Sequence, residues 1–134
     1  MNRKIEIFVF VLLFSIFLTS CTKPFTEEDN GRTINFGIYD PFEIELVGNP
    51  STGYIWDVLS YDSTIVKQVG KAEFEPIDDK IGSGGKYTFN FQTIAAGQTT
   101  LVLIYYRKFE ENVPPAKTFE LKVVSGTMGR ILED

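Results

Sequence analysis

Apolar and polar residues alternate one by one along several short runs, and this alternation constrains the fold more than any other feature. The runs 42–46, 87–92 and 119–123 each place an aromatic or aliphatic residue at every second position. Successive side chains of a β-strand point to opposite faces, so each run predicts a strand with one buried and one solvent-facing side. The chain is therefore expected to be built from strands.

Further strands are expected between these runs. Residues 101–106 are apolar on both faces, which predicts a central strand, and shorter candidates lie at 34–38, 54–60, 65–69 and 72–75. Proline- and glycine-containing turns separate the runs at short spacing. Seven to eight short strands in about 100 residues predict an all-β fold, an immunoglobulin-like antiparallel β-sandwich. Trp56 is expected to fill the space between the two sheets.

A separate segment precedes these strands. Arg3 and Lys4 are followed by an almost wholly apolar run at 5–18, which is shorter than the roughly 20 residues of a membrane-spanning helix. A basic start, a short apolar run and small residues before a cleavage point are typical of a secretory signal peptide. We therefore interpret residues 1–20 as a signal peptide.

The end of this segment, Leu18-Thr19-Ser20-Cys21, resembles the bacterial lipobox, in which the cysteine receives a lipid and becomes the mature N-terminus. The resemblance implies a lipidated Cys21 and a protein secreted across the inner membrane and anchored in the cell envelope. Thr22 after the cysteine favours the outer membrane, by analogy with other lipoproteins. The polar residues 21–32 are expected to form a tether, 33–125 the folded domain and 126–134 a C-terminal tail.

The residue inventory argues against catalysis. The sequence contains no histidine and a single cysteine, Cys21, so it lacks Ser-His and Cys-His nucleophile pairs and histidine-ligated metal sites. The acidic pairs Asp78-Asp79 and Glu110-Glu111 lie in polar stretches, where solvated surface is the commoner explanation. The formal net charge is −5 and no basic patch stands out, which argues against a nucleic-acid partner. We expect a binding protein without metal or cofactor.

Three segments at expected strand ends are candidates for binding. The first is Asn49-Pro50-Ser51-Thr52-Gly53-Tyr54, the second Gly82-Ser83-Gly84-Gly85 and the third Arg107-Lys108-Phe109. Proline and glycine restrict the first backbone to a tight turn, and the glycines of the second indicate either a flexible hairpin or a close approach to another molecule. In the third, Phe109 either folds back over the core or serves, beside a cation, as an exposed anchor.

In this order and at these distances, the three segments resemble the chagasin family of cysteine-protease inhibitors. The first matches the family's N-P-[TS]-T-G-[YF]-x-W loop through Trp56, and the second matches its G-x-G-G loop. The third departs from the family's R-P-W loop, because Lys108 replaces proline and Phe109 replaces tryptophan. Without proline the loop is expected to be less preorganised, and inhibition is expected to be weaker or directed at another protease, with the ring change contributing about 1 kcal/mol.

The resemblance implies that three loops at one end of the sandwich form a wedge against a papain-like cysteine protease. Residues 49–54 would enter the cleft beside the catalytic cysteine and histidine, with hydrogen bonds from Thr52. Arg107 and Phe109 would flank them on the primed side, and 82–85 would pair by main chain on the other. Inhibition would be reversible and tight, by a monomer.

Two alternatives stay open, and one of them is a structural envelope lipoprotein that would use none of these candidate segments. The other is a surface-anchored immunoglobulin-like adhesion or carbohydrate-binding lipoprotein, which would bind through an aromatic sheet face, where Tyr105 and Tyr106 are the candidates. Inhibition and adhesion would use different sites, the loop end and the sheet face, respectively.

Overall fold

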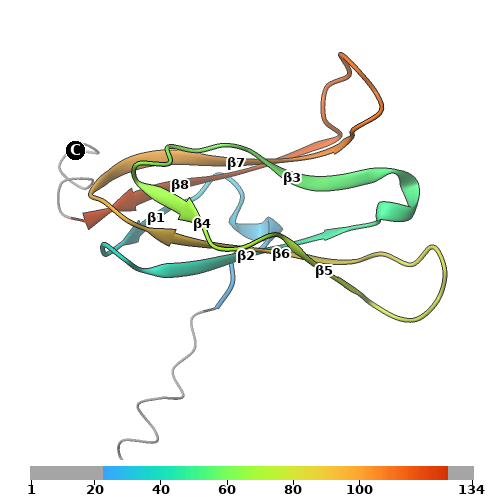
Figure 1. Cartoon of the computed structure of the whole chain (residues 1–134), viewed down its shortest axis with the longest axis horizontal. Coiled ribbons are helices and arrows are strands. Elements are labelled where there is room, and N and C mark those ends of the chain that lie inside the picture. Colours follow the sequence, from blue (N-terminus) through green and yellow to red (C-terminus); the bar gives the residue numbers. More distant parts are fainter. Residues whose placement is uncertain (1–22, 127–134) are drawn as a thin grey trace, which may run out of the picture.

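The computed structural model describes residues 23–126, which form two β-sheets packed face to face (Figure 1). The elements, in chain order, are η1 (Glu27–Asp29), β1 (Thr33–Phe36), β2 (Pro41–Gly48), η2 (Pro50–Thr52), β3 (Tyr54–Ser60), β4 (Val66–Gln68), β5 (Glu73–Pro76), β6 (Gly85–Thr93), β7 (Gly97–Arg107) and β8 (Lys117–Ser125). Cys21, the predicted signal peptide and all but the first residue of the predicted tail lie outside the described residues. Over the described range, no helix is long and apolar enough to span a membrane.

The strand pairing confirms the predicted immunoglobulin-like sandwich. One sheet has the order β1-β8-β7-β3, and the other is built on β6, which pairs with β2 along one edge and with β4 and β5 along the other. Among the strands described here, all pairs are antiparallel except β1 with β8. The chain arrives at β1 already hydrogen-bonded to β8, and it then runs alongside β8 in the same direction.

The core is made by the inward-facing members of the predicted alternation. In β2, Phe42 is 3 % exposed and Ile44 and Leu46 are fully buried, whereas Glu43 between them faces solvent. The aromatic and aliphatic positions of β6 and β8 meet them from the same sheet and from the opposite one. Burial of a side chain of this size stabilises a fold by about 1.5–3 kcal/mol, so the register of the alternation decides which face turns inward. Trp56 lies in this core, as expected.

The strand β7 has the predicted central position, between β8 and β3. Leu101 and Leu103 on its inner face are fully buried, but Val102 and Ile104 on the outer face remain half-exposed. The prediction of a central strand is therefore confirmed, and only the inner face of the strand is fully buried. Nothing among the described residues packs over the outer face as a third layer, and half-exposed aliphatic side chains are common on such a sheet face.

Residues 25–32, which we call the N-terminal strap, do not form the free tether expected for 21–32. Phe25 pairs with the edge of β2 by two backbone hydrogen bonds, and its ring packs edge-on against Phe36 and Phe42. At the other end of the strap, Gly31 donates a backbone hydrogen bond to Glu120 of β8. The strap thus connects the two sheets, and the tether prediction is wrong for these residues because polar composition concealed a buried aromatic anchor.

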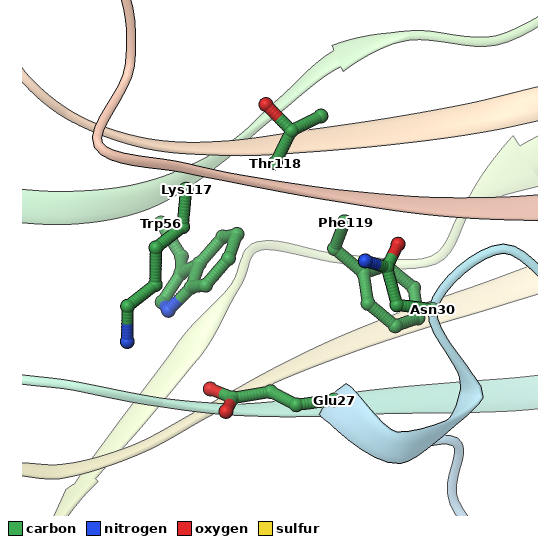
Figure 2. A pocket seen from close by; sticks show the side chains of 6 residues that line it. All are labelled: Glu27, Asn30, Trp56, Lys117, Thr118 and Phe119. Carbon is green, nitrogen blue, oxygen red and sulfur yellow. The ribbon is translucent and has the colours of Figure 1, made fainter.

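A pocket lies where the strap crosses between the sheets (Figure 2). Trp56 and Phe119 contribute aromatic rings to its lining, and Glu27 and Lys117 place charged groups at its edge. The Trp56 indole N–H donates to the carbonyl of Val47 at 3.0 Å, so the buried polar atom of this ring is satisfied within the fold. The pocket therefore lies between the N-terminal strap and strands β3 and β8.

Three connections gather at one end of the sandwich. Figure 1 shows the β2–β3 connection lying between the β5–β6 connection on one side and the β7–β8 connection on the other. These are the connections that contain the three candidate binding segments. The remaining question is whether side chains join them into one surface.

Candidate functional site

The β2–β3 connection, here called the central loop (residues 49–53), is a single turn of 3-10 helix with a cap at each end. The Asn49 side chain accepts hydrogen bonds from the Ser51 backbone N–H at 3.1 Å and from the Ser51 hydroxyl at 2.6 Å. Pro50 occupies the first helical position, where its missing N–H costs nothing. Gly53 ends the turn at φ +87°, a conformation that glycine adopts without strain. The loop is ordered by its own sequence.

Asn49 also holds the central loop to the rest of the molecule. Its backbone N–H donates to the Tyr105 hydroxyl at 2.9 Å, which ties the loop to the core. Its side-chain Nδ2 donates to the carbonyl of Gly82 at 2.8 Å, which ties it to the β5–β6 connection. The oxygen and the nitrogen of this one side-chain amide thus each bond to a backbone group.

Thr52 lies at the exposed end of the central loop. Its hydroxyl donates to the Asn49 carbonyl at 2.7 Å, and its own carbonyl accepts from Nε of Arg107 at 3.1 Å. The Ser51 and Thr52 side chains are exposed to solvent. The turn therefore exposes both side chains, whose hydroxyls donate back to Asn49 and whose oxygens can still accept a hydrogen bond, while its backbone is bound from both sides.

The β5–β6 connection, here called the glycine loop (residues 77–84), runs beside the central loop. Gly82 has φ +87° and open space around its Cα, so it serves the backbone turn. Gly85, which begins β6, packs closely against the neighbouring strand β5. A Cβ added at Gly85 would collide with the Glu75 carbonyl and come within 2.5 Å of the Phe74 ring. The close approach predicted for these glycines is thus internal at Gly85, and Gly82 and Ser83 remain accessible.

The β7–β8 connection, here called the third loop (residues 108–116), begins with Lys108 and Phe109. Phe109 is 71 % exposed, so it does not fold back over the core. One edge of its ring lies against the central loop, where a Cβ added to Gly53 would come within 2.9 Å of it. The three candidate segments therefore form one continuous surface, with the central loop in contact with both neighbours.

A ladder of stacked groups supports this surface from within. The Arg107 guanidinium lies 4.3 Å from the centre of the Tyr54 ring, Tyr54 stacks on Tyr105 at 5.2 Å, and Tyr105 contacts Trp56 at 5.2 Å. The pKa of Arg107 is raised, chiefly because its guanidinium donates a hydrogen bond to Glu110, with Tyr54 and the Glu110 charge adding to the effect. The ladder connects the exposed loops to the rigid core.

Sequence reasoning missed two kinds of residue at this site. Glu110 and Tyr105 position other groups through contacts that no local motif reveals. Ile77, Ile81 and Val113 are exposed apolar side chains on the two outer loops, with Ile81 fully exposed. Scattered exposed apolar residues are ordinary, but a group at one end of a molecule is a usual mark of an interaction surface.

The sheet-face alternative does not fit the arrangement of the tyrosines. Tyr105 points into the core and is 9 % exposed, and the hydroxyl of the half-exposed Tyr106 bonds Asp57 at 3.3 Å. Because they are neighbours on one strand, the two rings lie on opposite faces and form no common platform. Within residues 23–126, no group of three acidic or other metal-ligating side chains is placed to hold a metal ion.

Known proteins share this fold and sequence pattern. The chain is 37 % identical over 100 residues to Amoebiasin-1 of Entamoeba histolytica. The aligned region covers 73 % of this chain and 94 % of that protein. It is 29 % identical over 86 residues to Chagasin of Trypanosoma cruzi, covering 61 % and 78 % of the two chains.

Solved structures of similar proteins share this fold. The crystal structure of a cysteine protease inhibitor from Entamoeba histolytica superposes with a TM-score of 0.66 at 26 % identity, covering 75 % of this chain and 92 % of that one. The solution structure of Amebosin gives 0.65 at 32 % identity, covering 79 % and 99 %. The sequence model of the chagasin family of peptidase inhibitors, I42, matches residues 35–123. The chain therefore belongs to the chagasin family of peptidase inhibitors.

Proposed function

We propose that this protein is a reversible, tight-binding inhibitor of papain-like cysteine proteases that occludes the active-site cleft with its three loops. The observation that carries the proposal is the bracing of the central loop by both neighbours. Asn49 bonds the glycine loop, and the carbonyl of Thr52 accepts from Arg107 at the root of the third loop. The three loops thus behave as one wedge.

The braced turn explains how an inhibitor occupies a protease cleft without being cut. A substrate must be extended through the cleft, whereas the central loop is held in a helical turn by its caps at Asn49 and Gly53. Opening the turn would break its hydrogen bonds to Tyr105, Gly82 and Arg107 together. Because the loop is already ordered, binding costs little conformational entropy.

The outer loops would supply most of the apolar contact. Phe109 and Val113 are exposed on the third loop, and Ile77 and Ile81 on the glycine loop. Between them, the central loop presents hydroxyl and backbone groups for hydrogen bonds. Three loops of this size would bury about 800 Å² on each partner, which is a standard specific interface. No bond to the protease needs to form.

We also propose that Cys21 carries a lipid that anchors the inhibitor in the cell envelope, in the outer membrane. Support comes from the sequence at 18–21. Because Phe25 is bound to the domain, only residues 22–24 would connect it to the anchored cysteine. This connection spans at most about 14 Å when extended, so the domain would sit close to the membrane. Incorporation of labelled palmitate into the chain and its loss in Cys21→Ser test the anchor.

Titration of papain with the protein tests the inhibitory function. We expect stoichiometric loss of protease activity that recovers on dilution, with the inhibitor chain still intact after prolonged incubation. Activity that persists at excess inhibitor, or a central loop cut by the enzyme, would contradict the proposal.

A further inference from the structure

Arg107 stands at the junction of two of the three loops. Its Nε donates to the Thr52 carbonyl of the central loop at 3.1 Å, and its guanidinium packs over Tyr54. One of its two terminal nitrogens, Nη1, donates to the Glu110 carboxylate of the third loop at 2.9 Å. A long, flexible side chain is therefore fixed at three points, and Glu110 supplies the only charged one among the described residues.

We propose that Glu110 is a positioning residue of the inhibitory surface, which fixes Arg107 and thereby the turn that presents Phe109. The inference rests on the proposed function and names a residue that holds the loops in their binding arrangement. Lys108 stands where the family pattern has proline, so the third loop needs another source of rigidity. The Arg107–Glu110 pair provides one.

Glu110 closes the turn twice. Its backbone N–H donates to the Arg107 carbonyl at 3.2 Å, which makes Lys108 and Phe109 the two central residues of a four-residue turn. Its carboxylate then bonds the Arg107 side chain across the same turn. Both ends of the turn are joined by backbone and by side chain, which limits the directions that Phe109 can take.

The side chain of Glu110 is turned toward β7 and away from solvent. It is half-buried, whereas its neighbours Phe109 and Glu111 are exposed. With Tyr54 and Tyr106, it lines a small hollow between the third loop and β7. A carboxylate turned inward in this way acts on the protease through the groups it holds, here Arg107.

The expected effect is on affinity more than on stability. A partly exposed ion pair contributes little to folding, because water and ions screen it. Preorganisation of a binding loop acts mainly on the dissociation rate of the complex. We therefore expect Glu110→Ala to melt at nearly the wild-type temperature, to raise the inhibition constant for papain about tenfold, and to dissociate faster by a similar factor.

The decisive experiment is a double-mutant cycle in the full-length chain, solubilised in detergent and measured against papain. If Glu110 acts through Arg107, Glu110→Ala should raise the inhibition constant less than twofold when Arg107 is already alanine. Glu110→Gln, whose amide oxygen still accepts a hydrogen bond, should recover about half of the lost affinity on a logarithmic scale. Glu111→Ala is the matched control, and its inhibition constant should equal that of the wild type.

Two results would overturn the inference. One is a Glu110→Ala variant with wild-type inhibition, and the other is a tenfold loss that persists in the Arg107→Ala background, which would place Glu110 in direct contact with the protease. Both assume that the wild-type chain inhibits papain. A wild-type chain that leaves papain active refutes the proposed function itself, so the two failures are distinguishable.

Discussion

The side-chain amide of Asn49 donates a hydrogen bond of 2.8 Å to the backbone carbonyl of Gly82, 33 positions further along the chain. The same side chain caps its own turn by accepting from the Ser51 N–H. One asparagine thus shapes the central loop and joins it to the glycine loop. The two tasks use different atoms, so substitutions can separate them.

Asn49→Asp keeps the acceptor that caps the turn and replaces the donor to Gly82 with an oxygen. We expect nearly wild-type stability, because the cap remains, and an inhibition constant raised several-fold, because the two loops are no longer joined. Asn49→Ala should lose both functions and about 1 kcal/mol of stability. Urea unfolding and papain inhibition, measured on both variants, check the separation. Equal inhibition by the wild type and Asn49→Asp would contradict it.

Gly53→Ala introduces two costs at once. The residue has φ +87°, which costs an alanine about 1–2 kcal/mol, and the new Cβ would press on the Phe109 ring. Gly70→Ala is a matched control, since Gly70 has φ +74° and no heavy atom within 4 Å of the added Cβ. Both variants should lose stability in thermal unfolding because they share the backbone strain, but only Gly53→Ala should inhibit papain more weakly. An equal loss of inhibition by both would show that contact with Phe109 is unimportant.

The exposed apolar side chains of the glycine loop should affect binding without affecting folding. Ile81 is fully exposed, so Ile81→Ser removes no buried contact from the free protein. Loss of its apolar area at an interface would weaken inhibition by about 1 kcal/mol, a factor of about five. Leu59→Ser, at a 59 % exposed position of β3, should leave inhibition unchanged. If both variants inhibit like the wild type, the glycine loop does not use this side chain.

Asp29 makes the attachment of the strap depend on pH. Its pKa is lowered, first by the hydrogen bond from the Thr26 backbone N–H and further by Arg32. A folded-state pKa below the unfolded value of about 3.9 gives stability that is present above about pH 4 and is lost as the pH falls through the folded pKa.

Asp29→Asn should therefore be less stable than the wild type at pH 7 by less than about 1 kcal/mol, since the carboxylate is partly screened by solvent. The difference should be smaller at pH 2.5, because this stabilisation is lost as the pH falls through the lowered folded-state pKa of Asp29. Urea unfolding at the two pH values measures it, with Glu28→Gln as a neighbouring exposed control. A stability difference that stays constant with pH would show that the charge of Asp29 does not contribute to the stability of the fold.

Much of the fold follows from local pattern, and much of the site does not. Alternation at 42–46 and 119–123 identifies strands and their inward faces, because burial of large apolar side chains dominates the choice of face. The positions of the three loops follow from the same strands. The roles of Glu110 and Tyr105 depend on hydrogen bonds set by tertiary contacts, for which the sequence carries no periodic signal.

The N-terminal strap is a part of the fold that the sequence predicted wrongly. Residues 25–32 are polar on average, which predicts a solvated tether, but a single ring, Phe25, packs against two core phenylalanines. The side-chain oxygen of Asn30 also accepts a hydrogen bond from the Glu120 backbone N–H. A mean over composition cannot reveal one anchoring residue, and pairing to an exposed strand edge depends on the finished sheet.

The most direct test of the account compares two arginine substitutions of exposed threonines. Thr52 lies at the tip of the central loop, and Thr100 lies on the outer face of β7. The account predicts that Thr52→Arg abolishes inhibition of papain, since a long charged side chain prevents the turn from entering the cleft, while Thr100→Arg inhibits like the wild type. Inhibition that survives Thr52→Arg, or that is lost in Thr100→Arg with the fold intact, would contradict it.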